Sequence, residues 1–164
     1  MRLFVAIPME GAMLRAALEV QDAFRRHGVR GNYTKPENLH LTLAFIGEYP
    51  DPRAALEVID ALPFEPFELR SQGIGAFSDL WWLGFRDAPE LSSCVRRLRH
   101  GLAEAGIPFD KKRFSPHVTL VRQAVCPARG LPAVQMPDAG MTVRRIALMR
   151  SDRGRNGMIY TEIR

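Results

Sequence analysis

Alternating hydrophobic and polar positions predict strands in several short segments of this chain. The first is RLFVAI at 2–7, which Pro8 is placed to end. Four later segments also favour strands: NLHLTLAFIG at 38–47, FELRSQGIGAF at 67–77, LWWLGF at 80–85 and HVTLVR at 117–122. Near the end of the chain we expect two more, MTVRRIALMRS at 141–151 and MIYTEIR at 158–164, joined by DRGRNG.

Three other segments have the spacing of amphipathic helices. The first runs from Glu10 to His27, and Gly28 is placed to terminate it. The second, 51–62, begins with Asp51 as a capping residue and Pro52 in its first turn. The third covers 88–106 and carries its apolar residues on one face: Leu91, Val95, Leu98 and Leu102.

The order of these elements contains a weak internal repeat. A strand, a helix and a histidine-bearing strand are followed by strands, a helix and a second histidine-bearing strand. The segment 126–140 holds three prolines and two glycines, so we expect a loop there. The pattern predicts an α+β fold in which residues 1–164 form a single domain of two similar lobes sharing an interface.

Composition narrows the class of protein. The chain has 164 residues, 46% of them hydrophobic and 25% charged, which is typical of a soluble globular domain. Cys94 and Cys126 cannot build a disulfide framework or a four-ligand zinc site. In the opening MRLFVAIPME the apolar run is too short, and charged residues follow too closely, for a signal peptide or a membrane span. We therefore expect a cytoplasmic protein that meets no membrane. We also expect it to be a monomer.

Charge is distributed unevenly along the chain. Residues 1–110 contain 12 basic and 15 acidic side chains, whereas residues 111–164 contain 11 basic and 3 acidic ones. A basic C-terminal third favours an anionic partner such as phosphate, a nucleotide or RNA. A solubilising surface would produce the same excess, and the run Lys111, Lys112, Arg113 fits either interpretation.

The most informative pattern is His-x-Thr-Leu, which occurs in LHLTL at 39–43 and again in PHVTL at 116–120. Alternate residues of a strand share a face, so His40 and Thr42 point one way while the leucines point the other. His117 and Thr119 form the matching pair. If the two lobes face each other, two imidazoles and two hydroxyls surround one small volume.

Such a set suits phosphodiester chemistry. One neutral imidazole can take a proton from water while a protonated one gives a proton to a leaving oxygen. Threonine hydroxyls can bind phosphate oxygens, and the reaction requires neither a metal nor another cofactor. A two-histidine metal site is the weaker interpretation, because no carboxylate or thiolate accompanies either pair. His27 and His100 are read as a helix-end residue and a surface residue.

These motifs resemble those of the two-histidine phosphoesterase superfamily, in particular its RNA 2′,3′-cyclic phosphodiesterases, once called 2′-5′ RNA ligases. The resemblance spans nearly the whole chain and is carried by MRLFVAIP, ENLHLTLAFIGE, RFSPHVTLVR and IALMRSDRGRNGMIYTEI. It implies a bilobal fold around a cleft and hydrolysis of a 2′,3′-cyclic phosphate to a 2′-phosphate. His40 matches the general acid, His117 the general base, and Thr42 and Thr119 the phosphate-binding hydroxyls. The residues alone leave open which histidine is the acid.

Other site residues are less determined. Arg122 follows Thr119 by three positions, so strand alternation turns it away from the histidines unless a bulge redirects it, although the family motif favours a phosphate contact. Tyr33 stands where the family often has tryptophan, and it could stack on a base. Phe4 and Phe77 could also stack on a base, although core packing is the favoured role for both. We expect Trp81 and Trp82 to face opposite ways.

Three other functions remain open at this stage. Ligation of RNA through a 2′-5′ bond is the reverse reaction and would use the same residues. Other cyclic phosphates, such as ADP-ribose 1″,2″-cyclic phosphate, are also possible substrates. A non-catalytic RNA-binding module is the alternative from a different class, although two complete motifs argue against it.

Overall fold

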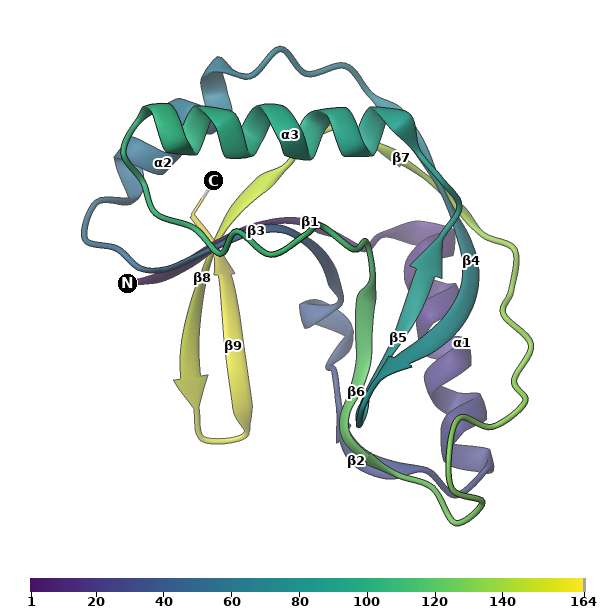
Figure 1. Ribbon diagram of the computed structural model, residues 1–164. Helices are drawn as coiled ribbons and strands as arrows, with labels where there is room; N and C mark the ends of the chain where they lie inside the picture. Colours follow the sequence, from purple (N-terminus) through teal and green to yellow (C-terminus); the bar gives the residue numbers. More distant parts are fainter. Residues whose placement is uncertain (164) are drawn as a thin grey trace.

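Nine strands form one sheet in the computed structural model, which describes residues 1–163 (Figure 1). The strands run in the order β7-β4-β5-β6-β3-β1-β8-β9, every pairing is antiparallel, and β2 also pairs with β6. Their bounds are β1 Arg2–Pro8, β2 Arg30–Tyr33, β3 His40–Glu48, β4 Phe67–Phe77, β5 Leu80–Phe85, β6 Val118–Val125, β7 Gly140–Val143, β8 Ala147–Gly154 and β9 Gly157–Glu162.

Three helices cover the sheet, and two of them pack against strands in the other half of the sheet from the strand that they follow. Helix α1 (Gly11–Arg26) follows β1 but packs against β6 and β7, whereas α3 (Pro89–Glu104) follows β5 but packs against β3. Helix α2 (Pro52–Ala61) lies beside α3 and contacts β8, and a short 3₁₀ helix, η1 (Pro36–Asn38), precedes β3. In Figure 1, α2 and α3 lie together on one side of the molecule and α1 lies behind β4 and β5. The α+β class predicted from the sequence is confirmed.

Local sequence explains where the helices begin and end. The Asp51 side chain accepts a hydrogen bond of 3.0 Å from the backbone N–H of Arg53, which caps α2 as predicted. At the end of α1, Gly28 has a φ of 78°, and the N–H of Val29 donates to the carbonyl of Phe24. This turn satisfies a backbone carbonyl that the helix would otherwise leave unpaired, and glycine adopts it without strain.

The leucines of the two histidine-bearing strands lie in the main hydrophobic core. Leu41, Leu43, Val118 and Leu120 are fully buried there, together with the apolar face of α3. This packing fixes which face of each strand the histidines occupy, because a shift of one residue would expose the leucines.

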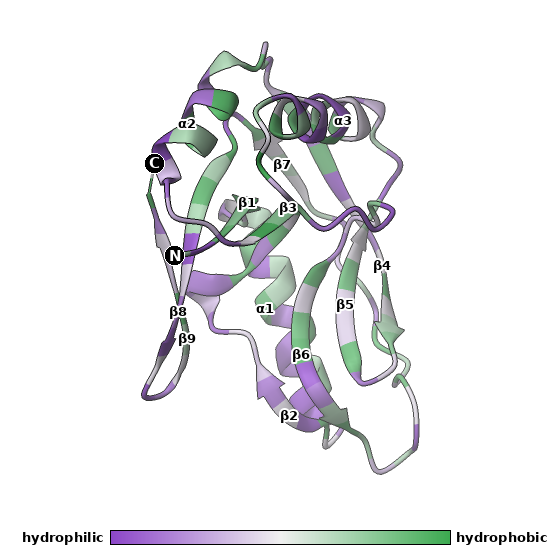
Figure 2. Ribbon diagram, turned by 60° about the vertical axis from the view of Figure 1, so that its left-hand side comes forward, coloured by the Kyte–Doolittle hydropathy of each residue, from purple (hydrophilic) through white to green (hydrophobic). Residues whose placement is uncertain are grey.

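Two sequence predictions about strands were wrong. The segment 141–151 is not one strand: β7 pairs with β4 at one edge of the sheet, and β8 pairs with β1 in the other half. Val143 and Ile146 are separated by two arginines and are therefore an odd number of positions apart. In a single strand their side chains would point to opposite faces, so one face could not bury both. Strand β2 was missed because RGNY is mostly polar, as its colour in Figure 2 shows. The last predicted strand includes Arg164, which lies outside the described residues; β9 ends at Glu162.

Gln21 is a buried polar residue that ties α1 to the second half of the sheet. Its side-chain amide donates 2.9 Å hydrogen bonds to the carbonyls of Thr34 and Leu120, and the residue is 1% exposed. Gln21→Leu is therefore expected to lower the free energy of unfolding by about 1–3 kcal/mol, because two hydrogen bonds are lost and the Leu120 carbonyl keeps only the Thr34 N–H as a donor. Chemical denaturation measures this, with Gln135→Leu in the exposed loop as the control; equal stability of the two variants would contradict the assigned role.

Candidate active site

The two His-x-Thr motifs meet across one strand pairing. Strands β3 and β6 are antiparallel, with Leu41 opposite Val118. Extending this register by one residue on each side sets His40 opposite Thr119 and Thr42 opposite His117. Directly opposed side chains on one face have Cβ atoms roughly 5 Å apart. The four polar side chains therefore share the face of the sheet that is turned away from the buried leucines.

His40 is held by two hydrogen bonds. Its Nδ1 lies 2.6 Å from the backbone carbonyl of Asn38, and its Nε2 lies 2.9 Å from the hydroxyl of Thr42. A carbonyl only accepts, so Nδ1 carries a proton and Nε2 is the atom that titrates. The ring packs against those of Phe4 and Tyr160, with centroids at 5.0 and 5.2 Å, and these two rings also contact each other at 5.1 Å.

His117 has the matching arrangement in the second motif. Its Nδ1 lies 2.7 Å from the carbonyl of Ser115, again two residues earlier in the chain. A carbonyl only accepts, so Nδ1 carries a proton and Nε2 is free to accept one. Its ring contacts Phe77 edge-on at 5.1 Å and Trp82 at 6.4 Å. In both motifs a backbone carbonyl thus fixes the tautomer that presents Nε2, which histidine-based proton transfer needs.

The electrostatic environment of His40 favours its neutral form. Burial is the largest cause that lowers the pKa of His40 from its ordinary value of 6.5, and the Arg122 cation, together with His117 whenever that ring carries a charge, lowers it further. The hydrogen bond to the Asn38 carbonyl acts in the opposite direction. An anionic group bound beside His40 would offset the two cationic neighbours and raise this pKa.

A β-bulge in β6 decides the position of Arg122. Trp81 pairs with Val121 and Trp82 with Thr119, so one step along β5 matches two steps along β6. Leu120 and Val121 are consequently both fully buried, and the alternation is reset after them. Arg122 therefore returns to the face of Thr119 and lines a cavity with His40 and Thr42.

That cavity has a volume of about 560 Å³ and is formed mainly by β1, β3 and the β8–β9 hairpin. His117 and Thr119 are not among its lining residues, and Tyr33, the last of the predicted site residues, lines a neighbouring cavity. One face of its ring is covered by the guanidinium of Arg25, 4.1 Å from the ring centroid. Its hydroxyl donates a 2.9 Å hydrogen bond to the carbonyl of Val29.

Aromatic residues around the histidines were only partly predicted. Phe77 is 45% exposed and lies against His117, so the expectation that it packs in the core was wrong. Phe4 is buried as expected, but it packs against His40 in a cluster separate from the main core. Trp81 is buried against Phe24 while Trp82 lies near His117, which confirms that they face opposite ways. Tyr160 was missed, because nothing in the local sequence around 160 indicates that β9 passes beside His40.

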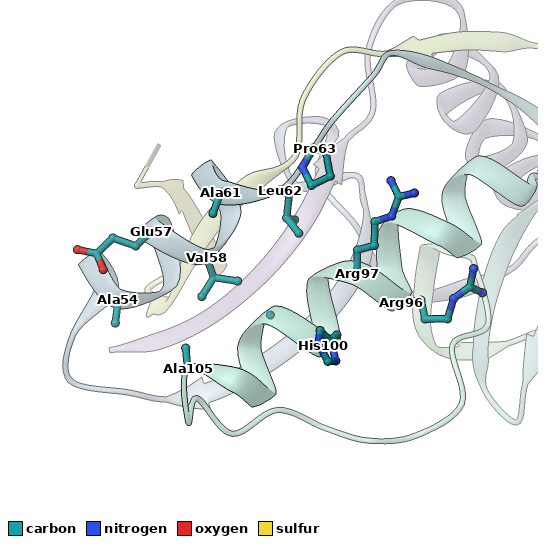
Figure 3. A pocket seen from close by; sticks show the side chains of 11 residues that line it. Ala54, Glu57, Val58, Ala61, Leu62, Pro63, Arg96, Arg97, His100 and Ala105 are labelled. Carbon is teal, nitrogen blue, oxygen red and sulfur yellow. The ribbon is translucent and has the colours of Figure 1, made fainter.

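Another cavity, of about 850 Å³, is a groove between α2 and α3 and shares no lining residue with the His40 cavity (Figure 3). Its walls are mostly small apolar residues, with Arg96, Arg97 and His100 on the α3 side. Within residues 1–163, no group of three or more His, Cys, Asp or Glu side chains is arranged to hold a metal ion. None of the helices in this part of the chain is both long and apolar enough to cross a membrane.

Comparison of the sequence and of the fold with those of known proteins identifies the family. A sequence model of the 2′-5′ RNA ligase superfamily matches residues 14–155. A protein from Aeropyrum pernix named RNA 2′,3′-cyclic phosphodiesterase is 33% identical, over 90% of this chain and 92% of its own. The crystal structure of TT0787 from Thermus thermophilus superposes with a TM-score of 0.79 at 30% identity, covering 100% of this chain and 96% of that one. Escherichia coli LigT complexed with 3′-AMP gives a TM-score of 0.81 at 28% identity, covering 99% and 95%.

The two facing His-x-Thr pairs are the motifs that carry the resemblance to the two-histidine phosphoesterases, and the fold brings them to one antiparallel pairing. Within that class, the chain belongs to the 2′-5′ RNA ligase superfamily.

Proposed function

We propose that this protein hydrolyses 2′,3′-cyclic phosphates on RNA ends or nucleotides and leaves a 2′-phosphomonoester. The observation that carries the proposal is the pairing of Leu41 with Val118, which brings both His-x-Thr motifs to one face of the sheet. Relatives that carry the name RNA 2′,3′-cyclic phosphodiesterase, at 27–33% identity, support the choice of substrate.

In the proposed mechanism His117 is the general base. Its Nε2 removes a proton from water while the water oxygen forms a bond to phosphorus. The bond from phosphorus to the 3′-oxygen breaks on the opposite side. Because Nδ1 donates to the Ser115 carbonyl, the ring keeps Nε2 available as the acceptor.

His40 is the general acid, and its protonated Nε2 gives a proton to the departing 3′-oxygen. Its low pKa in the ligand-free protein fits this role because the bound phosphate, being anionic, favours protonation of the buried ring. Thr42 and Thr119 donate hydrogen bonds to the non-bridging oxygens. Arg122 neutralises the charge that develops on them.

The product of a single reaction tests the proposal most directly. With a 2′,3′-cyclic mononucleotide we expect only the 2′-phosphate, identified by phosphorus NMR or chromatography against both isomers. Turnover is expected to persist in EDTA, since two histidines and the substrate account for every proton that moves. A 3′-phosphate product would contradict the assignment of the leaving oxygen, and loss of activity in EDTA would contradict the metal-free mechanism.

A further inference from the structure

A second cavity, of about 490 Å³, adjoins the His40 cavity. Arg122, Met158 and Tyr160 line both, so the two spaces are separated only by these side chains. The outer wall of the second cavity is β2 with the residues that follow it, Thr34 and Lys35. Figure 1 shows the β8–β9 hairpin extending in the same direction as β6 and β2, and its tip supplies the opposite wall.

The two cavities differ in charge. The His40 cavity contains the carboxylates of Glu48 and Asp152 alongside its arginines, so its cations are largely balanced. The second cavity is lined by two cations, Lys35 and Arg122, and by no carboxylate. Within residues 1–163, neither of these cations forms a salt bridge. An unbalanced pair of cations in a concave site favours an anionic ligand.

The other lining groups are those that bind nucleosides. The side chains of Asn32 and Asn156 carry donors and acceptors that can pair with base or ribose, and the Asn32 amide is held in place by a 2.7 Å hydrogen bond to Gln123. The ring of Tyr33 lies on the other face of the sheet, because Tyr33 pairs with the buried Val121 and packs against Arg25 of α1.

The walls of this cavity are built rigidly. At Gly31 a Cβ atom would lie 2.8 Å from the Arg122 carbonyl, so only glycine lets β2 approach β6 this closely. On the opposite side, the buried side chain of Asn38 donates a 3.0 Å hydrogen bond to the carbonyl of Met158 in β9. The Asn38 carbonyl also accepts from His40, so one residue connects the second cavity to the catalytic ring.

We propose that the second cavity binds the ribonucleotide that precedes the cyclic-phosphate nucleotide in an RNA strand. The inference rests on the proposed function, because the terminal nucleotide must lie in the His40 cavity. The linking phosphate then passes Arg122 and reaches Lys35, and the preceding nucleoside enters the space beside Asn156. The cavity makes the enzyme prefer RNA ends to free cyclic mononucleotides.

The test compares a 2′,3′-cyclic mononucleotide with a dinucleotide that ends in the same cyclic phosphate. Wild-type kcat/KM is expected to be higher for the dinucleotide. In Lys35→Gln it should fall about tenfold for the dinucleotide, the size of one lost charge-assisted hydrogen bond, and change less than about twofold for the mononucleotide. Asn156→Ala should show the same selectivity to a smaller extent. Lys111→Gln, which removes a lysine outside both cavities, is the matched control and should affect neither substrate.

Equal effects of Lys35→Gln on both substrates, or none on the dinucleotide, would overturn the subsite. Calorimetric binding of the 2′-phosphate products separates this outcome from failure of the proposed function, because binding requires no turnover. If neither substrate is hydrolysed but the dinucleotide product binds more tightly in a manner that depends on Lys35, the subsite stands and the catalytic proposal fails. If both product affinities are equal, the subsite is wrong whatever the activity.

Discussion

Replacing either His40 or His117 with alanine is expected to lower kcat for 2′,3′-cyclic phosphate hydrolysis by roughly a thousandfold, the usual contribution of a positioned acid or base. Each ring contacts the rest of its motif through a hydrogen bond from Nδ1 to a backbone carbonyl. Each variant therefore loses one proton-transfer group, while the leucines of its strand stay buried in the core. The double variant should be only slightly slower than the single ones, because acid and base act in the same step. Steady-state kinetics measures all three.

The chain supplies its own matched controls for this experiment. His100→Ala removes an exposed imidazole on α3 that pairs only with Glu104, and His27→Ala removes one at the end of α1. Both should retain nearly full activity. Circular dichroism and affinity for the 2′-phosphate product should be close to wild type in every variant. A His117→Ala enzyme that kept more than about a tenth of its activity would contradict the role of the general base.

Arg122→Gln is expected to reduce kcat/KM by roughly a hundredfold and also to shift its pH dependence. For kcat/KM the relevant acid is His40 of the free enzyme, whose pKa lies below 6.5 owing to burial and then to its cationic neighbours. An acid with a lowered pKa loses its proton at a lower pH. As the pH is raised, kcat/KM of the wild type should therefore begin to fall before pH 6.5 is reached. Removing the Arg122 cation raises the pKa of His40, so the declining limb should move to higher pH.

Two further variants separate the charge of Arg122 from its shape. Arg122→Lys keeps the cation but not the planar fork, so its limb should stay near the wild-type position while the rate remains reduced. Arg155→Gln removes an exposed cation from the β8–β9 turn that lines neither cavity, and should change neither property. A slow Arg122→Gln enzyme with an unshifted limb would show that Arg122 acts on the substrate alone. An unshifted limb and an unchanged rate together would remove Arg122 from the site.

The helices and most of the strands could be predicted because their signals are local. Asp51 caps α2 and Gly28 ends α1 through contacts within a few residues. Alternation in β3 and β4 indicates one buried face in each strand, and the continuous apolar run of β1 fits a strand that is buried on both faces. The segment 141–151 could not be read in this way, because both parts look like strand and only their partners differ. Strand β2 has almost no apolar signal, and it forms because β6 offers an edge beside Gly31.

For the site, the sequence by itself determined the reactive groups and their faces. Two His-x-Thr pairs with buried leucines between them leave the imidazoles and hydroxyls only one side of each strand, since side chains in a strand alternate. The tertiary structure decided how those groups work together. The pairing of Leu41 with Val118, the carbonyls that fix both tautomers, the bulge that turns Arg122 inward and the contact of Tyr160 with His40 all join residues through the folded backbone or across distant segments. Such contacts leave no periodic trace in a sequence, because they depend on the path of the folded backbone and on where distant strands meet.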